Sequence, residues 1–409
     1  MPLTGLLEAV ALIMILGCFA QGMQILHNYR GTLHASKLLS QPLNGGNDTS
    51  QGSIAIIPCK LGASSEDEAI YITRSIRDLL SSRAVGRAML VIEPSDLEAL
   101  NTKYRDLTKD PGVEFLISDL NACKTCSGKN RALITALREV RSTSKKAIVL
   151  LDCDAYHYPK AVEIAVRGAI TEKAIVTGYR WYILRDIYGA LYNTVSSLAF
   201  EYMGIDKTRI VWGGLVAMPT EFPSLLNLID RFSEELSDDA VVNIEARKKG
   251  YRVIFCPACI SITPPPRGFR AFISWAVRQM IIVRLYTPRG FMTLLTIYLA
   301  NTALLAIAIT AIVINTSNLI RILFLTLLIS YIALGCIRAL VAIKIYDPLS
   351  IYRDNVLERE KILWKISYVA LTAIRAPLLL FILIIARISK RFSWRGSIYC
   401  IKKNRAYPC

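Results

Sequence analysis

The sequence predicts an α/β domain, with a Rossmann-like mixed sheet and helices on both faces, joined to transmembrane helices at both ends of the chain. Between Ser53 and Tyr179, short apolar runs alternate with amphipathic helical patterns, which is typical of βαβ units. Long apolar runs open and close the chain, and a run of about twenty apolar residues can cross a bilayer core. The mean hydropathy of +0.38 is too high for an ordinary soluble protein.

The first apolar run predicts an uncleaved membrane anchor over residues 1–28. It is interrupted by Glu8 and Gln21, and it has neither a basic N-terminal flank nor a clear cleavage site, which favours an anchor over a signal peptide. Arg30 and Lys37 follow the run and place the next segment in the cytoplasm. Residues 29–51 are rich in Gly, Ser, Asn and Leu without a clear period, so we expect a linker there.

A soluble domain is expected over residues 52–264. Its predicted strands are the apolar runs SIAIIP at Ser53, RAMLVIE at Arg87, VEFLIS at Val113, AIVLL at Ala147 and AIVTGY at Ala174. Helical patterns fill the gaps, for example Glu66 to Leu80, with Ser64 or Ser65 as the N-terminal cap. Ligands of such sheets bind beyond the carboxyl ends of the strands, so we expect the functional site at that edge.

The last third of the chain predicts membrane-associated helices. Residues 265–290 carry Arg, Trp and Phe at helical spacing, which predicts an amphipathic helix at the membrane surface. Residues 291–389 contain three apolar runs, Phe291–Ile314, Leu319–Ile343 and Ile366–Ile388. Three full spans would place the basic tail, residues 390–409, opposite the soluble domain and against the positive-inside rule. Alternatively, Pro377 and its two preceding residues break the last run into a re-entrant hairpin, because proline interrupts helical hydrogen bonding.

Charge and histidine content exclude several functions. The formal net charge is +17, and 20 basic against 4 acidic residues lie between Ser261 and Cys409. The excess therefore belongs to the hydrophobic third and does not indicate a nucleic-acid partner. Three histidines are too few for a histidine-based triad or a three-histidine zinc site to be credible, and His157 is expected at the surface. Catalysis must therefore rest on carboxylates.

The ten cysteines predict reduced thiols in an intracellular compartment, because they do not form the framework of a short secreted domain. Two Cys-x-x-Cys pairs, Cys123/Cys126 and Cys256/Cys259, together have the composition of a four-thiolate zinc site. Nothing in the sequence brings the two pairs together in space. Zinc binding, disulfides and unpaired thiols all stay open, and unpaired thiols are favoured.

Three short motifs carry candidate chemistry. Asp152 and Asp154 follow the run AIVLL, and two carboxylates at a strand end can hold a hard divalent cation that also binds phosphate oxygens. Asp238 and Asp239 open a predicted helix, where a carboxylate commonly serves as a cap. Arg278 lies in the expected interfacial helix, where the ordinary role of an Arg is to extend to the membrane surface. Each motif alone is weak.

The order and spacing of these motifs resemble those of a known family. The matching segments are IIPCK at Ile56, IEPSD at Ile92, SGKNRAL at Ser127, DCD at Asp152, TGYRWY at Thr177, WGGLVAMP at Trp212, LSDDAVV at Leu236 and WAVRQ at Trp275. Together they resemble the membrane-bound inverting glycosyltransferases of family two, which have the GT-A fold, and most closely the ceramide-glucosyltransferase-like branch. The resemblance covers residues 53–288 and the arrangement of anchor, domain and spans.

The resemblance implies roles for the acidic motifs and for Arg278. Asp152 and Asp154 would hold Mg or Mn against the diphosphate of a nucleotide-sugar, and the metal would offset charge on the leaving group. Asp239 would be the general base that deprotonates the acceptor hydroxyl. Arg278 would stabilise the departing diphosphate as a planar, permanently charged group.

The resemblance also implies which residues surround the two substrates. The donor-binding residues would be Pro58, Lys60, Glu93, Lys129, Asp152, Asp154 and Arg278. The acceptor-binding residues would be Trp212, Gly213, Gly214, Asp238, Trp275 and Gln279. Two positions depart from the family pattern, because Trp and Gln are exchanged around Arg278 and because Glu93 stands where the family often has an Asp.

The resulting hypothesis is an inverting glycosyltransferase that moves a hexose from a UDP-sugar to the hydroxyl of a membrane lipid at the cytoplasmic face. Its expected partners are the nucleotide-sugar, the lipid acceptor and the bilayer, without nucleic acid. A polyprenyl phosphate and a growing polysaccharide are alternative acceptors. A lipid alcohol is preferred because a polysaccharide synthase would normally have more spans, and a polyprenyl-phosphate transferase would not need the Trp-x-x-Arg-Gln helix. A non-catalytic membrane scaffold or transport component is the alternative from a different class.

Overall fold

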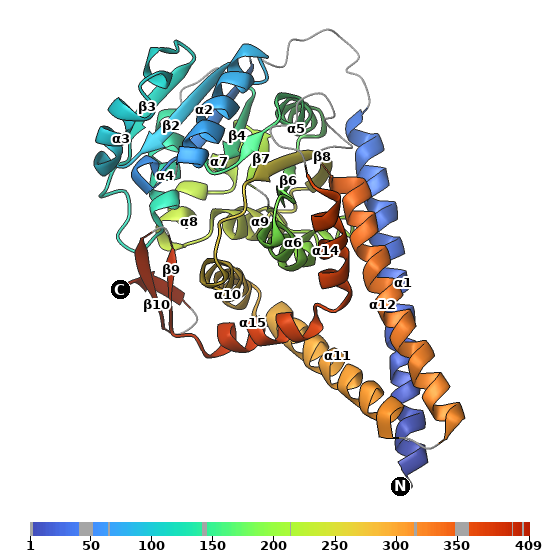
Figure 1. Cartoon of the computed structure of the whole chain (residues 1–409). Coiled ribbons are helices and arrows are strands. Elements are labelled where there is room, and N and C mark those ends of the chain that lie inside the picture. The colour runs from blue at the N-terminus through green and yellow to red at the C-terminus, as the bar shows by residue number, and fades with distance from the viewer. Residues whose placement is uncertain are drawn as a thin grey trace.

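An eight-stranded mixed sheet forms the centre of the computed structural model (Figure 1). The structure describes residues 3–40, 52–63, 66–140, 145–212, 214–314, 317–347, 360–394, 396–402 and 405–409. The strands are β1 Ser53–Pro58, β2 Arg87–Ile92, β3 Val113–Ile117, β4 Ala147–Leu151, β5 Tyr156–His157, β6 Ile175–Tyr182, β7 Leu215–Pro219 and β8 Val253–Thr263. Their order in the sheet is β3-β2-β1-β4-β7-β6-β8-β5.

The strand directions place several carboxyl ends at one edge of the sheet. β1 runs parallel to β2 and β4, and β2 runs parallel to β3. Beyond β4, β7 runs antiparallel to both β4 and β6, whereas β6 and β8 are parallel. The five predicted strands are confirmed as β1, β2, β3, β4 and β6, and the predicted mixed character of the sheet is confirmed as well.

Helices cover both faces of the sheet, as predicted. Alternate residues of β1 face opposite sides, so Ala55 joins a core with α2 and α5 while Ile56 joins a core with α4, α8 and α9. The domain helices are α2 Glu66–Ser81, α3 Leu97–Thr102, α4 Gly128–Val140, α5 Pro159–Glu172, α6 Ile187–Phe200, α7 Phe222–Leu225, α8 Leu228–Glu234 and α9 Asp238–Lys248. The expected cap of α2, Ser64 or Ser65, lies outside the described residues.

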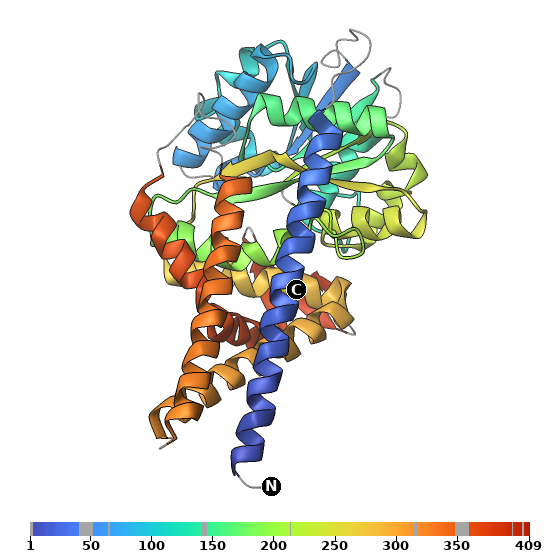
Figure 2. The same cartoon turned by 90° about the vertical axis from the view of Figure 1, so that its right-hand side faces the viewer.

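Three helices are long and apolar enough to cross a membrane within the described part of the chain. They are α1 Leu3–Ser40, α11 Pro288–Ile314 and α12 Asn318–Tyr346. α1 and α12 lie side by side, and the start of α1 lies with the end of α11 and the start of α12 at the end of the molecule away from the sheet (Figures 1 and 2). This arrangement fits an integral membrane protein.

α1 continues through residues 29–40, for which the sequence predicts a linker. Its last turns pack on the domain, where Leu39 is buried in the core that includes α5. Arg167 Nη2 donates to the Leu39 carbonyl at 2.6 Å, so this part of the helix is also held by a hydrogen bond. Tertiary packing of this kind stabilises a helix that has little sequence periodicity of its own. Residues 41–51, the rest of the expected linker, lie outside the described residues.

The last apolar run is broken into two helices. α14 Ile362–Ala373 and α15 Ala376–Ile388 meet at an angle of 70°. Arg375 at the break is buried, and its guanidinium nitrogens lie 2.5 and 2.7 Å from the carboxylate oxygens of Glu201 at the end of α6. The break therefore packs against the domain, and Pro377 in the first turn of α15 cannot continue the preceding helix.

The basic tail forms a small antiparallel sheet beside the domain. Its strands are β9 Arg391–Trp394, β10 Ser397–Lys402 and β11 Arg405–Pro408, in the order β11-β10-β9. Phe392 and Tyr399 stack with ring centroids 5.4 Å apart and join a core with α10 (Phe269–Tyr286) and α15. Figure 1 shows the small sheet next to α8 and α10. The tail and the domain therefore lie at the same end of the helix pair α11 and α12.

The expectation of reduced thiols is wrong for eight of the ten cysteines. The disulfides are Cys59–Cys153, Cys123–Cys126, Cys256–Cys259 and Cys400–Cys409. Each Cys-x-x-Cys motif pairs within itself, so the two motifs share no zinc site. The Cys59–Cys153 bond joins the ends of the adjacent parallel strands β1 and β4, a proximity that only the sheet order reveals. Cys18 and Cys336 are unpaired.

Candidate functional site

The two carboxylates of the Asp152-Cys-Asp154 motif converge on one cation. Both follow the carboxyl end of β4. In β6, Arg180 Nη2 pairs with Asp152 Oδ2 and lies 2.9 Å from Asp154 Oδ1. Burial alone would raise the pKa of Asp152, but the charges of Lys129 and Arg180 outweigh burial and hold this pKa below its usual value. Asp152 is therefore ionised, and both carboxylates contact a single cationic nitrogen.

Lys129 connects the two acidic motifs. It lies in the first turn of α4, and its Nζ is 2.5 Å from Asp152 Oδ1 and 2.7 Å from Asp238 Oδ2. Burial would lower the pKa of Lys129, but the charges of Asp152 and Asp238 raise it above its usual value. The lysine therefore stays charged. Two motifs that are far apart in the sequence belong to one charged centre.

The second acidic pair opens α9, as the sequence predicts. Ser237 is the cap, and its Oγ accepts a backbone N–H of the first turn at 3.3 Å. From α10, Tyr286 Oη accepts the Ser237 N–H at 3.1 Å. From α4, the Asn130 side chain donates to the Glu235 carbonyl at 2.7 Å. The start of α9 is thus fixed by both neighbouring helices, which determines where its carboxylates lie.

Asp238 and Asp239 have different environments. Asp238 is 5% exposed and forms the ion pair with Lys129. Asp239 is half-buried, and burial together with the charge of Asp238 raises the pKa of Asp239 well above its usual range. A carboxyl group with a raised pKa is a stronger proton acceptor when it is ionised. Asp239 is therefore the member of the pair that suits proton transfer.

Glu93 forms a second charged cluster at the same edge of the sheet. It follows β2, and its Oε1 accepts from Arg131 Nη2 at 3.0 Å while its Oε2 is 4.0 Å from Lys60 Nζ. A Cβ atom at Gly128 would lie 3.1 Å from Glu93 Oε1, so the start of α4 lies directly against this carboxylate. Pro58 ends β1, two residues before Lys60. The structure thus brings four expected donor residues, Pro58, Lys60, Glu93 and Lys129, to the ends of β1 and β2 and the start of α4.

Gly214 lies against the Asp152–Arg180 pair. Its φ is +71°, and a Cβ atom there would lie 2.8 Å from Asp152 Oδ2 and 3.0 Å from Arg180 Nη2. The Asp152 amide donates to the Gly214 carbonyl at 2.8 Å. Both the backbone conformation and the close approach require glycine. Gly213, which we expect beside it, lies outside the described residues.

Arg278 contacts the C-terminal tail. Its guanidinium carbon lies 5.1 Å from the ring centroid of Trp394 in β9, a cation–π geometry. Burial raises the pKa of Tyr182 to about 12. The charge of Asp154 also raises this pKa, whereas the charges of Arg180 and Arg278 lower it. Tyr182, at the end of β6, contacts the ring of Trp275 in α10 and hydrogen-bonds with Arg180 of the acidic centre. The tail also reaches the start of α4, because the Tyr399 hydroxyl hydrogen-bonds with the backbone there.

The other expected acceptor residues pack against aromatic rings. Trp275 lies 5.5 Å from Tyr182 and 4.7 Å from Tyr192 between ring centroids. Trp212 lies 5.3 Å from the ring of Tyr179. Gln279 is half-buried beside Arg278 on α10. Within the described part of the acceptor set, Asp238 and Gly214 are the members in contact with the charged centre. The two Trp side chains pack in separate aromatic groups, Trp212 with Tyr179 and Trp275 with Tyr182 and Tyr192.

His157 is buried, which corrects the expectation of a surface histidine. It is 2% exposed, its Nε2 lies 2.9 Å from the Asp152 carbonyl oxygen, and its Nδ1 lies 2.9 Å from Ser261 Oγ. A carbonyl only accepts, so Nε2 carries the proton. Burial lowers the pKa of His157 to about 4, and the side chain is therefore neutral near pH 7. The short strand β5 places this ring under the turn that carries the two carboxylates.

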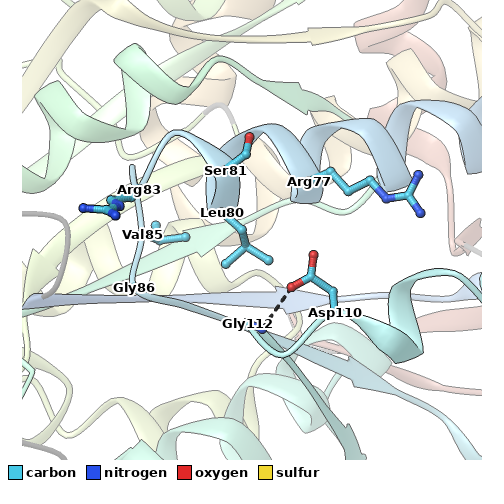
Figure 3. Close-up of a pocket in the computed structure, with 8 residues that line it drawn as sticks. All are labelled: Arg77, Leu80, Ser81, Arg83, Val85, Gly86, Asp110 and Gly112. Carbon is cyan, nitrogen blue, oxygen red and sulfur yellow. Dashed lines mark hydrogen bonds between the residues drawn. The ribbon is translucent and has the colours of Figure 1, made fainter.

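The pocket in Figure 3 lies at the other end of the strands, where β2 and β3 begin. It is lined by Arg77, Leu80, Ser81, Arg83, Val85, Gly86, Asp110 and Gly112. Gly86 and Gly112 precede β2 and β3, whereas the charged centre follows the carboxyl ends of the strands. This pocket is therefore separate from the candidate site.

Sequence reasoning missed Arg180, Arg131 and Trp394. Arg180 lies near the carboxyl end of a predicted strand, which is the edge where ligands were expected, so its position was the available signal. Arg131 follows Lys129 in the SGKNRAL segment. No residue at helical spacing from Arg131 marks it as a site residue. Trp394 reaches the site only because α14 and α15 return the tail to the domain, and no local pattern indicates that contact.

Comparisons with known proteins give one family match. Residues 228–407 match the family model described as glycosyl transferase family 21. A putative nucleotide-diphospho-sugar transferase from Desulfovibrio desulfuricans is 12% identical over 53% of this chain and 82% of that chain, with a TM-score of 0.32. A 4-diphosphocytidyl-2C-methyl-D-erythritol synthase from Anaerococcus prevotii is 10% identical over 56% of this chain and 97% of that chain, with a TM-score of 0.34. No curated protein matches the chain.

Proposed function

We propose that this protein, a glycosyltransferase by its family 21 match, transfers a hexose from a UDP-sugar to the hydroxyl of a membrane lipid with inversion at the anomeric carbon. The observation that carries the proposal is the position of Lys129 between Asp152 and Asp238. This lysine joins the carboxylates expected at the donor diphosphate to the acidic pair that contains the expected base. One site therefore holds the groups that both substrates need.

Asp152 and Asp154 would hold Mg or Mn. Their fit is supported by Arg180, because one oxygen of each carboxylate already contacts the same cationic nitrogen. Within the described residues no group of three or more Asp, Glu, His or Cys side chains is placed so that it could hold a metal ion, so diphosphate oxygens and water would complete the ligand set. When bound, the metal would neutralise charge on the diphosphate.

Asp239 would accept the proton of the acceptor hydroxyl while the hydroxyl oxygen attacks the anomeric carbon. The bond from that carbon to the diphosphate breaks on the opposite face, and the nucleoside diphosphate leaves. The raised pKa of Asp239 makes its carboxylate a better base than an ordinary surface carboxylate. Arg278 would pair with the leaving diphosphate, and Lys129 would keep the donor end and the base at a fixed separation.

A membrane-embedded acceptor is supported by the position of α10. This helix carries Arg278 and packs on α11 and α15 at the end of the domain from which the membrane helices leave (Figure 1). Tyr286 of α10 also binds the backbone of Ser237, next to the acidic pair. A lipid hydroxyl at the bilayer surface would therefore meet the site without leaving the membrane.

The cytoplasmic face is proposed from the distribution of basic residues. Residues 1–29 and 290–320 contain no Lys or Arg, and these segments include the ends of α1 and α11 farthest from the domain. The basic tail lies with the domain, so the positive-inside rule supports a cytoplasmic position of the domain.

The proposal is tested with the full chain reconstituted in lipid. We expect release of UDP from one member of a panel of nucleotide-sugars, dependent on Mg or Mn and lost with chelator, together with a glycosylated lipid detected by mass spectrometry. Glycosylation of an added polyprenyl phosphate or polysaccharide in place of a lipid alcohol would contradict the acceptor. Absence of donor binding and of nucleotide release with every donor would contradict the proposed reaction.

A further inference from the structure

Arg180 occupies the point at which the two motif carboxylates converge. Its Nη2 contacts Asp152 and Asp154, and its side chain is only 12% exposed. The other oxygen of Asp152 contacts Lys129. The carboxylates are thus neutralised by cations that belong to the chain itself.

A divalent ion that binds alone would have to displace this guanidinium. Arg180 would then be left in a largely buried position without an anionic partner, which is costly in free energy. The situation differs when a diphosphate binds together with the ion, because the diphosphate offers new acceptor oxygens to the displaced guanidinium. Planar guanidinium groups bind such oxygens in pairs.

We propose that Arg180 is a resident cation of the metal position, and that it makes binding of the divalent ion conditional on the nucleoside diphosphate. This inference rests on the proposed function, because it assumes a diphosphate donor. Its consequence is positive coupling between metal and diphosphate, and coupling of this kind is reciprocal by thermodynamic linkage. Arg180 is here a positioning residue that controls occupancy of the metal site.

The test measures Mn²⁺ binding to the full chain in lipid nanodiscs by electron paramagnetic resonance, with and without UDP. In the native protein we expect UDP to tighten Mn²⁺ binding by about tenfold or more. In Arg180→Gln we expect Mn²⁺ to bind more tightly without UDP, and the coupling to fall below about threefold. Arg87→Gln is the matched control, because Arg87 pairs with Glu114 at the start of β2, far from the site. It should keep the native coupling.

Arg180→Lys keeps a cation but not the planar group, so we expect its coupling to lie between those of the native protein and Arg180→Gln. If Arg180→Gln does not fold, as judged by thermal unfolding, the lysine variant carries the test. Equal coupling in the native protein and the folded variant would overturn the inference. UDP binding without any metal coupling would overturn it as well, while leaving the proposed donor intact. Failure of the native protein to bind UDP would overturn both proposals.

Discussion

Lys129 and Asp238 form an ion pair in which Nζ lies 2.7 Å from Oδ2. The same nitrogen contacts Asp152, so the first turn of α4 is placed between the end of β4 and the first turn of α9. This contact brings the acidic motif after β4 and the acidic pair of α9 together in one site. It also explains how the largely buried Asp238 is tolerated, because its charge has a fixed partner.

Lys129→Met should abolish UDP binding and destabilise the protein by about 3 kcal/mol, since it leaves the buried carboxylate of Asp238 unpaired. Lys160→Met is the control, because Lys160 forms an exposed ion pair with Glu163 and should change stability by less than about 0.5 kcal/mol. Titration with UDP and unfolding in detergent measure the two effects. Native UDP affinity in Lys129→Met would contradict the proposed position of the lysine at the donor.

Gly214→Ala should lose most metal and UDP binding, because its Cβ would approach both Asp152 and Arg180 within about 3 Å. Gly250→Ala separates this effect from backbone strain. Gly250 has a similar φ of +74°, but a Cβ there meets nothing within 4 Å. Both variants should lose about 1 kcal/mol or more of stability from the positive φ. Only Gly214→Ala should lose binding, and an equal loss in both would refute the contact argument.

His157 should make stability depend on pH in a defined direction. Its folded pKa of about 4 is below the ordinary 6.5, so its contribution is complete above pH 6.5 and is lost as the pH falls toward 4. Across that window the slope is up to about 1.4 kcal/mol per pH unit. Thermal unfolding of His157→Gln should show a flatter profile there. A profile identical to that of the native protein would show that this histidine does not titrate as described.

Trp394→Ala should weaken UDP binding or turnover by about 3- to 30-fold, because it removes the ring on which the Arg278 guanidinium rests. Ile398→Ala truncates an exposed side chain of the same small sheet and should have no effect. Deletion of the Arg278 guanidinium by Arg278→Gln should make the Trp394 substitution silent. Additive losses in the double variant would contradict a role of Trp394 through Arg278.

Much of the fold was predictable because each central strand can be recognised from its own short sequence. β1 and β4 are continuous apolar runs of the length expected for buried strands, and the acidic residues after β4 follow from their place at a strand end. The helix of residues 29–40 was not predictable, because packing against the domain rather than periodicity stabilises it. The bend before α15 was predictable only as one of two alternatives, through Pro377.

The candidate site was predictable where one motif supplied the side chain and was missed where distant segments meet. Asp152, Asp239 and Arg278 were predicted from short motifs and a family resemblance, and their roles stay predictions. Arg180 and Trp394 required the order of the strands and the return of the tail, which are tertiary properties. The buried state of His157 depends on the pairing of β5 with β8, a two-residue strand that no sequence pattern marks.

We propose that the acidic centre performs transfer with Asp239 as its base. The most direct measurement compares UDP binding and single-turnover transfer in the native protein, Asp239→Asn and the exposed control Asp230→Asn. We predict that Asp239→Asn keeps UDP affinity within about threefold and loses about 10²- to 10⁴-fold in transfer rate, with Asp230→Asn unchanged. A transfer rate in Asp239→Asn close to that of the native protein would show that Asp239 is not the base.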